Sequence, residues 1–276
     1  MKEGDGMNRA IGVIDSGVGG LTVAYELMRQ LPNEQMIYVG DTLRCPYGPR
    51  PAHEVKQFTT EIVRFLLKKD IKMIVIACNT ATAFALEDLK KELDIPILGV
   101  IQPGARAAIK STINNKIGVI GTEGTIYSQA YVKALKQINY ELMVTTLACP
   151  SFVPMVEKGI LEGKQAEKVV SQSLKQLKHI QSIDTLVLGC THYPLLEKTI
   201  QRVIGSHIQI ISSSEETARE ASAILQEHHL LAQNTRKNEH CFYVTGNLQD
   251  FMKIYQTVFK ENLEVLNGST IGKVNL

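Results

Sequence analysis

The sequence predicts an α/β protein made of two similar doubly wound parallel-sheet domains, related by pseudo-symmetry, with an active site in the cleft between them. Short apolar runs alternate with amphipathic helical patterns, which is typical of parallel sheets covered by helices on both faces. Three landmarks also occur twice in the same order, 104 to 112 residues apart. They are the runs Ile11–Ser16 and Ile117–Thr122, the Cys-Pro pairs that begin at Cys45 and Cys149, and the cysteines Cys78 and Cys190. A duplicated unit explains all three, and we expect Asp15 of one unit to lie opposite Thr122 of the other.

Apolar runs and chain breakers define the elements of the first unit. Short runs that are nearly unbroken in Val and Ile are typical of buried strands. The glycine-rich turn at residues 17–20 opens a helix that Pro32 stops, and three prolines with a glycine make residues 41–51 a loop. The predicted strands are Ile11–Asp15, Met36–Gly40, Met73–Cys78 and Ile95–Ile101, and the predicted helices end near Leu31, Lys69 and Leu93.

The second unit repeats this pattern, and a tail follows it. Its predicted strands are Lys116–Gly121, Glu141–Ala148 and Thr185–Gly189. Beyond Ser212 we expect a helix to about Leu231, a polar stretch, and a last strand at His240–Thr245. Because the repeat ends before the tail, we expect the tail to return to the first unit. The predicted domains are residues 1–99 plus 212–276, and residues 100–211.

Composition narrows the class of protein. With 276 residues, 44% of them hydrophobic, the chain can bury two cores. The net charge of +2 and the lack of a basic tract argue against nucleic acid as a partner. Five cysteines without a C-x-x-C spacing predict free thiols and a cytoplasmic location. No apolar run approaches the roughly 18 residues that cross a bilayer, so no membrane partner is expected. Residues 1–6 are predicted to be a polar leader.

The segment Asp15-Ser16-Gly17 follows the first predicted strand. It resembles the aspartate motif of subtilisin-like serine proteases, but no His-Gly-Thr or Gly-Thr-Ser motif accompanies it, so a protease is excluded. A dinucleotide-binding fingerprint is incomplete, because Thr22 stands where the third glycine belongs. Capping of the next helix by Asp15 stays open beside a role in catalysis.

Two strand-end cysteines give the strongest functional signal. Cys78 and Cys190 each stand where an apolar strand meets the next helix, the usual site of chemistry in an open α/β sheet. A helix N-terminus lowers a thiol pKa, although a single buried cysteine more often serves as a small apolar side chain. Cys190 and His192 have the spacing of a metal-binding pair but lack further clustered ligands, so no metal site is predicted. The structural cysteines are predicted to be Cys45, Cys149 and Cys241.

Six motifs carry a family resemblance. They are Asp15–Thr22, Asp41–Gly48, Ala77–Ala81, Gly121–Thr125, Ala148–Pro150 and Gly189–Pro194. With them the chain resembles the cofactor-independent glutamate racemases of the aspartate/glutamate racemase superfamily. The resemblance implies interconversion of L- and D-glutamate without cofactor or metal, which supplies D-glutamate for peptidoglycan synthesis, and an enzyme that is commonly a homodimer.

The resemblance also implies a role for each site residue. Inverting Cα without a cofactor needs a base on one face and an acid on the other, which two thiols across a cleft can supply. Cys78 would deprotonate D-glutamate with help from Asp15, and Cys190 would deprotonate L-glutamate with help from His192, beside Glu157. The implied substrate-binding residues are Asp15, Ser16, Tyr47, Gly48, Asn79, Thr80, Thr122, Thr191 and His192. Asp41 is a further candidate for the substrate ammonium, whereas Arg44 and Arg50 are not expected to clamp a carboxylate.

Two alternatives stay open. An aspartate racemase, or a related two-cysteine isomerase, would differ only in the length of substrate side chain that it accepts. A regulatory protein is the other alternative, since some members of the resembled family inhibit DNA gyrase, but the near-neutral charge does not support it.

Overall fold

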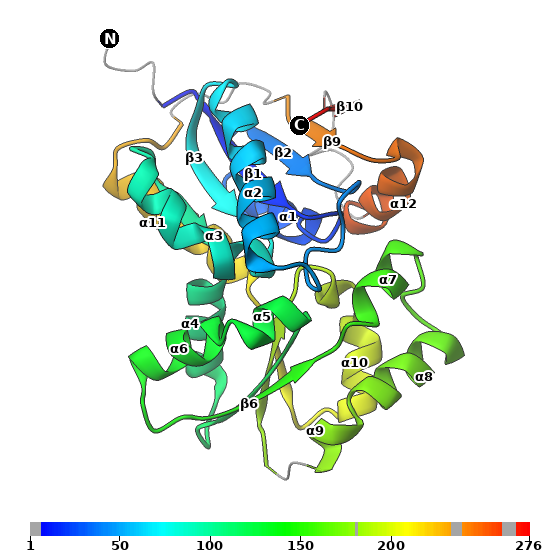
Figure 1. Ribbon diagram of the computed structural model, residues 1–276. Coiled ribbons are helices and arrows are strands. Elements are labelled where there is room, and N and C mark those ends of the chain that lie inside the picture. The colour runs from blue at the N-terminus through cyan, green and yellow to red at the C-terminus, as the bar shows by residue number, and fades with distance from the viewer. Residues whose placement is uncertain (1–6, 180–181, 233–238, 261–268) are drawn as a thin grey trace.

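The computed structural model of the protein describes residues 7–179, 182–232, 239–260 and 269–276. It contains two parallel sheets, each covered by helices, in two bodies that lie one above the other in Figure 1. The predicted fold class is therefore confirmed. The predicted polar leader at residues 1–6 lies outside the described residues, as does most of the predicted polar stretch before His240.

Six strands form the upper sheet in the order β10-β9-β2-β1-β3-β4, all parallel. Their bounds are β1 Ala10–Asp15, β2 Met36–Gly40, β3 Ile71–Ile76, β4 Ile97–Gly99, β9 Cys241–Val244 and β10 Thr270–Lys273. The strand β1 is buried along its whole length and sends alternate side chains into different cores, Ile11 and Val13 into one and Ile14 into the other. This burial on both faces explains why its sequence is an unbroken apolar run.

Four parallel strands form the lower sheet in the order β6-β5-β7-β8. Their bounds are β5 Lys116–Gly121, β6 Met143–Ala148, β7 Thr185–Gly189 and β8 Gln209–Ser212. The order β2-β1-β3-β4 in the upper sheet has the same pattern, with the first strand of each unit between its second and third. The repeated landmarks therefore occupy equivalent places, and both strand-end cysteines follow the third strand of their unit.

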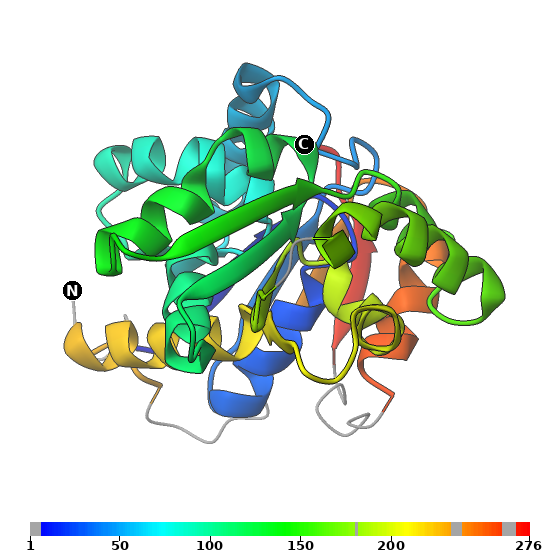
Figure 2. The same cartoon turned by 90° about the horizontal axis from the view of Figure 1, so that it is seen from below.

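Helices cover both sheets (Figures 1 and 2). Those of the upper body are α1 Leu21–Gln30, α2 Ala52–Leu67, α3 Asn79–Glu92, α11 Ser214–Glu227 and α12 Leu248–Val258. Those of the lower body are α4 Ile101–Ser111, α5 Glu123–Tyr127, α6 Ala130–Ile138, α7 Phe152–Glu157, α8 Lys164–Ser173, α9 Lys175–His179 and α10 Glu197–Ile204, with a 3₁₀ turn at Tyr193–Leu196. Within the described ranges, no helix is both long enough and apolar enough to cross a bilayer.

The observed strands differ from the predicted ones in three places. The strand predicted at Ile95–Ile101 is limited to β4, because Pro96 cannot donate a backbone hydrogen bond and α4 already begins at Ile101. The edge strand β8 was not predicted, since only its two central residues are buried. The strand predicted as the last, His240–Thr245, is β9, and α12 and β10 follow it.

The chain passes between the two bodies twice, after β4 and after β8. The helices that follow these crossings, α4 and α11, pack against each other. Arg106 of α4 pairs with Glu220 of α11, and Lys110 pairs with Glu216 at 2.9 Å. The two crossings therefore lie side by side. The predicted division into residues 1–99 plus 212–276 and residues 100–211 stays a prediction.

A buried histidine joins the start of β9 to the start of β2. The backbone N–H of Met36 donates to Nδ1 of His240 at 3.2 Å, and burial lowers the pKa of His240 to about 4. His240 is 5% exposed, so its charged form loses most of its hydration in the folded state.

Acid is therefore expected to destabilise the protein through His240. A folded-state pKa below the unfolded value contributes stability above pH 6.5, and this stability is lost as the pH falls toward 4. Between pH 7 and pH 4.5 the free energy of unfolding should drop by about 2 kcal/mol through this group. In His240→Asn the side-chain oxygen can accept the same hydrogen bond but does not titrate. Urea unfolding at both pH values should show a smaller drop for the variant, and equal drops would contradict the assignment.

Candidate active site

The carboxyl ends of the strands in the two units face each other. The hydroxyl of Thr191, after β7, donates to Asp15 at the end of β1, at 3.1 Å. The hydroxyls of Thr122, after β5, and Thr80, after β3, lie 2.8 Å apart. Asp15 is therefore opposite Thr191 and not, as the repeat suggested, opposite Thr122. In both contacts the end of the first strand of one unit meets the end of the third strand of the other unit.

Cys78 caps helix α3 with its sulfur. The backbone N–H of Ala81 donates to Sγ at 3.4 Å, and the thiol donates to the hydroxyl of Ser16 at 3.5 Å. Burial, with the nearby negative charge of Asp15, raises the pKa of Cys78 to about 12. The thiol therefore carries its proton at neutral pH, and it stands ready as an acid.

Asp15 is fully buried beside Cys78. Its carboxylate accepts hydrogen bonds from the backbone N–H of Gly17 at 3.0 Å and from Thr191. Burial raises the pKa of Asp15 above its ordinary value, although the positive charge of His192 opposes this effect. A Cβ at Gly20 would lie 2.4 Å from Cβ of Asp15, so only glycine allows the turn to pass this close. Asp15 is thus a buried carboxyl group close to Cys78, and its role in proton exchange stays a prediction.

Cys190 is the first of three side chains that contact one another in series. Its sulfur lies 3.8 Å from Nδ1 of His192, and Nε2 of His192 lies 2.7 Å from Oε1 of Glu157. Burial by itself would lower the pKa of His192, but its contacts with Cys190, Cys45 and Glu157 raise it well above its ordinary value. The contact with His192 in turn lowers the pKa of Glu157 against the effect of burial. His192 is therefore an imidazolium that is paired with a carboxylate and faces the Cys190 sulfur.

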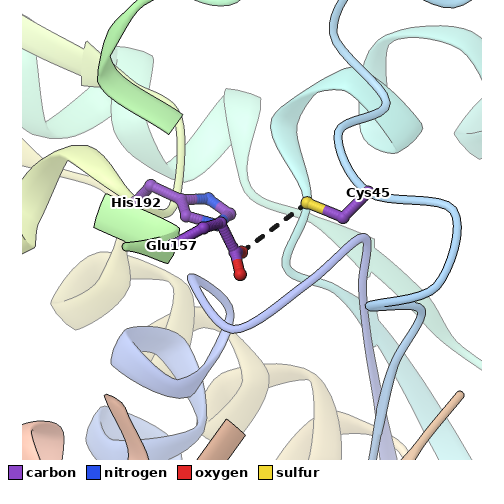
Figure 3. A group of neighbouring side chains, drawn as sticks. All are labelled: Cys45, Glu157 and His192. Carbon is purple, nitrogen blue, oxygen red and sulfur yellow. Dashed lines mark hydrogen bonds and ion pairs between the residues drawn. The ribbon is translucent and has the colours of Figure 1, made fainter. Parts of the chain in front are cut away.

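Cys45 also reaches this series of side chains, which the sequence did not predict. The Cys45 thiol donates to Oε1 of Glu157 at 3.6 Å (Figure 3). Burial raises the pKa of Cys45 to about 11. Cys45 and Glu157 are 112 residues apart, so no local pattern could have brought them together.

Asp41 holds the loop that follows β2. It accepts hydrogen bonds from the hydroxyl of Tyr47 at 2.5 Å, from Nε of Arg44 at 2.5 Å and from the hydroxyl of Thr245 at 2.8 Å. Burial and the charge of Asp41 raise the pKa of Tyr47. The Asp41 carboxylate is thus engaged by three side chains, and its predicted role with the substrate ammonium stays a prediction.

The loop arginines are also engaged. Arg44 pairs with Glu61 and lies 4.1 Å from the ring centre of Phe58, and Arg50 pairs with Glu54 at 3.1 Å. Nη2 of Arg44 is nevertheless buried without a hydrogen-bond partner among the described residues, so the expectation that neither arginine clamps a substrate carboxylate stays a prediction.

Asn79 carries the clearest sign of a missing ligand. The hydroxyl of Tyr131 donates to its Oδ1 at 2.8 Å, whereas its Nδ2 has no hydrogen-bond partner among the described residues. Asn79 is only 2% exposed, and a buried unpaired donor costs about 1–3 kcal/mol. An acceptor atom of a bound molecule would remove this cost.

The remaining predicted residues line the same contact region. The backbone N–H of Gly124 donates to the carbonyl of Gly48 at 2.8 Å, and a Cβ at Gly48 would lie 2.5 Å from Cβ of Thr122. All nine predicted binding residues are buried: Asp15, Ser16, Tyr47, Gly48, Asn79, Thr80, Thr122, Thr191 and His192. Some of them contact each other between the two bodies: Asp15 with Thr191, Thr80 with Thr122, and Gly48 with Thr122.

Comparison with known proteins assigns the family. A family model described as Asp/Glu/Hydantoin racemase matches residues 11–221. The chain belongs to this racemase family. The prediction of a cofactor-independent amino-acid racemase is thereby confirmed at the level of the family.

Similar proteins extend this membership over nearly the whole chain. The glutamate racemase of Oceanobacillus iheyensis is 61% identical over 256 residues, which are 93% of this chain and 93% of that protein. The crystal structure of the glutamate racemase isoform RacE1 from Bacillus anthracis superposes with a TM-score of 0.91 at 47% identity, over 98% of both chains. The glutamate racemase of Francisella tularensis, solved with D-glutamate, superposes with a TM-score of 0.86 at 33% identity, over 98% of this chain and 97% of that one. The resemblance that the motifs carried is confirmed.

Proposed function

We propose that this racemase interconverts L-glutamate and D-glutamate by a two-thiol acid/base mechanism, with Cys78 and Cys190 on opposite faces of Cα. The observation that carries the proposal is the pair of buried strand-end thiols, each beside a different proton-exchanging group, Asp15 for Cys78 and His192 for Cys190. The names of the similar proteins support glutamate as the substrate.

The protonated Cys78 thiol supports a direction for the first step. In that direction Cys190 is the base that removes the α-proton of L-glutamate. The Cys78 thiol then donates its proton to the other face of Cα, which yields D-glutamate and leaves Cys78 as the thiolate. The reverse turn starts from this second form. Asp15 and His192 exchange protons with their thiols and so return the enzyme from one form to the other.

Neutral donors would bind the substrate carboxylates. The amide Nδ2 of Asn79 lacks a partner among the described residues, and it lies in the first turn of α3, where free backbone N–H groups favour anions. The substrate ammonium would stabilise the thiolate at Cys78, which burial and Asp15 disfavour. Closing the site around Cα excludes the water that would otherwise stabilise the thiolate and weaken it as a base.

The wider roles follow from the same proposal. D-glutamate made by this enzyme would enter peptidoglycan synthesis in the cytoplasm, and two copies would form a homodimer. Aspartate racemisation is the second candidate, because a shorter side chain would present Cα to the same thiols. The similar proteins, named glutamate racemases at 47% and 61% identity, favour glutamate.

Racemisation can be followed by the loss of circular dichroism. Purified protein should remove the signal of either L- or D-glutamate without added pyridoxal phosphate. It should act on aspartate far more slowly. Treatment with a chelator should leave the rate unchanged, since the two thiols and their partners supply the whole acid/base chemistry. A protein that is inactive on glutamate but active on aspartate, or one that needs a metal, would overturn the proposal.

A further inference from the structure

One group of side chains beside the catalytic thiols has the composition of a metal site. Cys45 comes from the loop after β2, Glu157 ends helix α7, and His192 follows β7, so three distant segments converge (Figure 3). We propose that Cys45, Glu157 and His192 bind a zinc ion, and that the bound ion inhibits the racemase.

The donor atoms are spaced for one ion. The Cys45 sulfur, an imidazole nitrogen of His192 and a carboxylate oxygen of Glu157 all lie within 4.8 Å of one another. Ligand atoms around one tetrahedral zinc ion are roughly 3.4 to 3.6 Å apart, given bonds of about 2.0–2.3 Å. The sulfur is 3.6 Å from the carboxylate oxygen, whereas His192 and Glu157 are 2.7 Å apart and would have to separate slightly. The Glu157 side chain is 29% exposed and can make this shift.

Gly17 lies directly against all three donors. A Cβ added at Gly17 would lie 2.7 Å from Oε1 of Glu157, 2.9 Å from the Cys45 sulfur and 3.5 Å from Cε1 of His192. The three side chains are therefore packed closely around the Gly17 backbone, which fixes them beside one another. Among the described residues, no other group of three such side chains is this close together.

The donor set selects the kind of ion. A thiolate, an imidazole and a carboxylate suit zinc, whereas Mg²⁺ and Ca²⁺ prefer oxygen ligands only. When zinc binds, the S–H bond of Cys45 and the Nε2–H bond of His192 break, the sulfur and the nitrogen form bonds to the ion, and both protons pass to solvent. Three protein ligands leave a fourth position for a water molecule, as in open zinc sites.

Inhibition follows from the two nitrogens of His192, and this step rests on the proposed function. Nε2 faces Glu157 and would bind the ion, whereas Nδ1 faces the Cys190 sulfur. An ion bound at Nε2 takes the place of the contact with Glu157 and holds the imidazole ring in one position. The ring then cannot adjust to the Cys190 sulfur during turnover, so the bound ion inhibits the enzyme.

Cobalt(II) is the probe for the site. Stoichiometric Co²⁺ added to the full chain under reducing conditions should produce sulfur-to-cobalt charge-transfer absorption and the visible bands of a tetrahedral site. Cys45→Ser should lose the charge-transfer band, because a serine hydroxyl offers no thiolate sulfur, and the racemase activity that this variant has without metal serves as its own reference for inhibition. Zinc should inhibit the parent enzyme reversibly. The zinc concentration for half-inhibition should rise at least about 100-fold in Cys45→Ser, because even groups that only orient metal ligands are worth 10- to 100-fold.

Controls distinguish this site from other thiols. Cys241 is a partly exposed thiol in β9, remote in sequence from the cluster, and Cys241→Ser should keep both the band and the inhibition. A band that survives in Cys45→Ser but disappears in Cys78→Ser or Cys190→Ser would mean that the metal binds the catalytic thiols, and would overturn the assignment. Absence of any band would overturn it as well. A band that depends on Cys45 in a protein without racemase activity would contradict the proposed function while leaving the metal site intact.

Discussion

Replacing either Cys78 or Cys190 by alanine is expected to abolish glutamate racemisation, with a loss of at least about 1,000-fold in kcat/KM. Inversion needs a base on one face of Cα and an acid on the other, so the remaining thiol cannot complete the reaction alone. Serine in either position should fail as well, because a hydroxyl is a far weaker acid than a thiol. The rate is measured from the circular dichroism of L- and D-glutamate.

A half-reaction separates the two thiols. A glutamate analogue with a leaving group on nitrogen needs only the removal of the α-proton, because elimination follows without reprotonation. Cys78→Ser should eliminate from the L-form through Cys190, and Cys190→Ser should eliminate from the D-form through Cys78. Loss of both eliminations in one variant would point to damage of the whole site.

The repeat supplies a matched control for these substitutions. Cys149 is fully buried, follows β6 as Cys45 follows β2, and has no part in the proposed proton transfers. Cys149→Ala should therefore racemise at nearly the parent rate. Racemisation by Cys78→Ser or Cys190→Ser at a comparable rate would refute the two-base mechanism.

Asp15→Asn is expected to lower kcat/KM by about 100-fold or more, the usual contribution of a proton-transferring side chain. Asparagine has nearly the same shape as aspartate and can still accept hydrogen bonds from Gly17 and Thr191, but it cannot exchange a proton with Cys78. The loss should be equal in the two directions, because the enantiomers have the same free energy in water and their equilibrium constant is one.

Elimination from the analogue should show a difference between the reactions of Cys78 and Cys190, which kcat/KM for racemisation cannot show. If Asp15 serves Cys78, elimination from the D-form should slow strongly in Asp15→Asn while elimination from the L-form changes little. Asp184→Asn is the matched control, since Asp184 accepts hydrogen bonds from Thr112, Thr185 and backbone N–H groups at the opposite end of the lower sheet from the thiols. Equal slowing of both eliminations by Asp15→Asn would mean that Asp15 acts on the site as a whole.

The predicted elements that agree best with the structure are the central strands. The sequence predicted the bounds of β2, β5 and β7 correctly, because strands buried on both faces are unbroken apolar runs. The repeat also predicted equivalent strand ends for Cys78 and Cys190, and each of them follows the third strand of its unit. Short edge strands such as β8 and β10 have too few buried residues to produce a pattern.

The parts of the site that escaped prediction depend on distant segments. The approach of Cys45 to Glu157 and His192 links positions that are 112 and 147 residues apart, and no spacing rule covers it. Tyr47 and Asp41 are close in sequence and form a hydrogen bond. The Asp41 carboxylate is also held by the Thr245 hydroxyl, which is 204 residues away. Family resemblance supplied the residue types at these positions, whereas the contacts themselves required the fold.

The pairing of β9 with β2 has a consequence for how the chain assembles on the ribosome. The lower sheet has all its strands once residue 212 has been translated, but the upper sheet waits for β9 and β10, which are made last. Until then β2 exposes a row of unpaired backbone N–H and C=O groups, the kind of edge to which strands of other chains add. The upper body is thus begun first and completed last. While the chain is being synthesised, its N-terminal sheet has an open edge at β2.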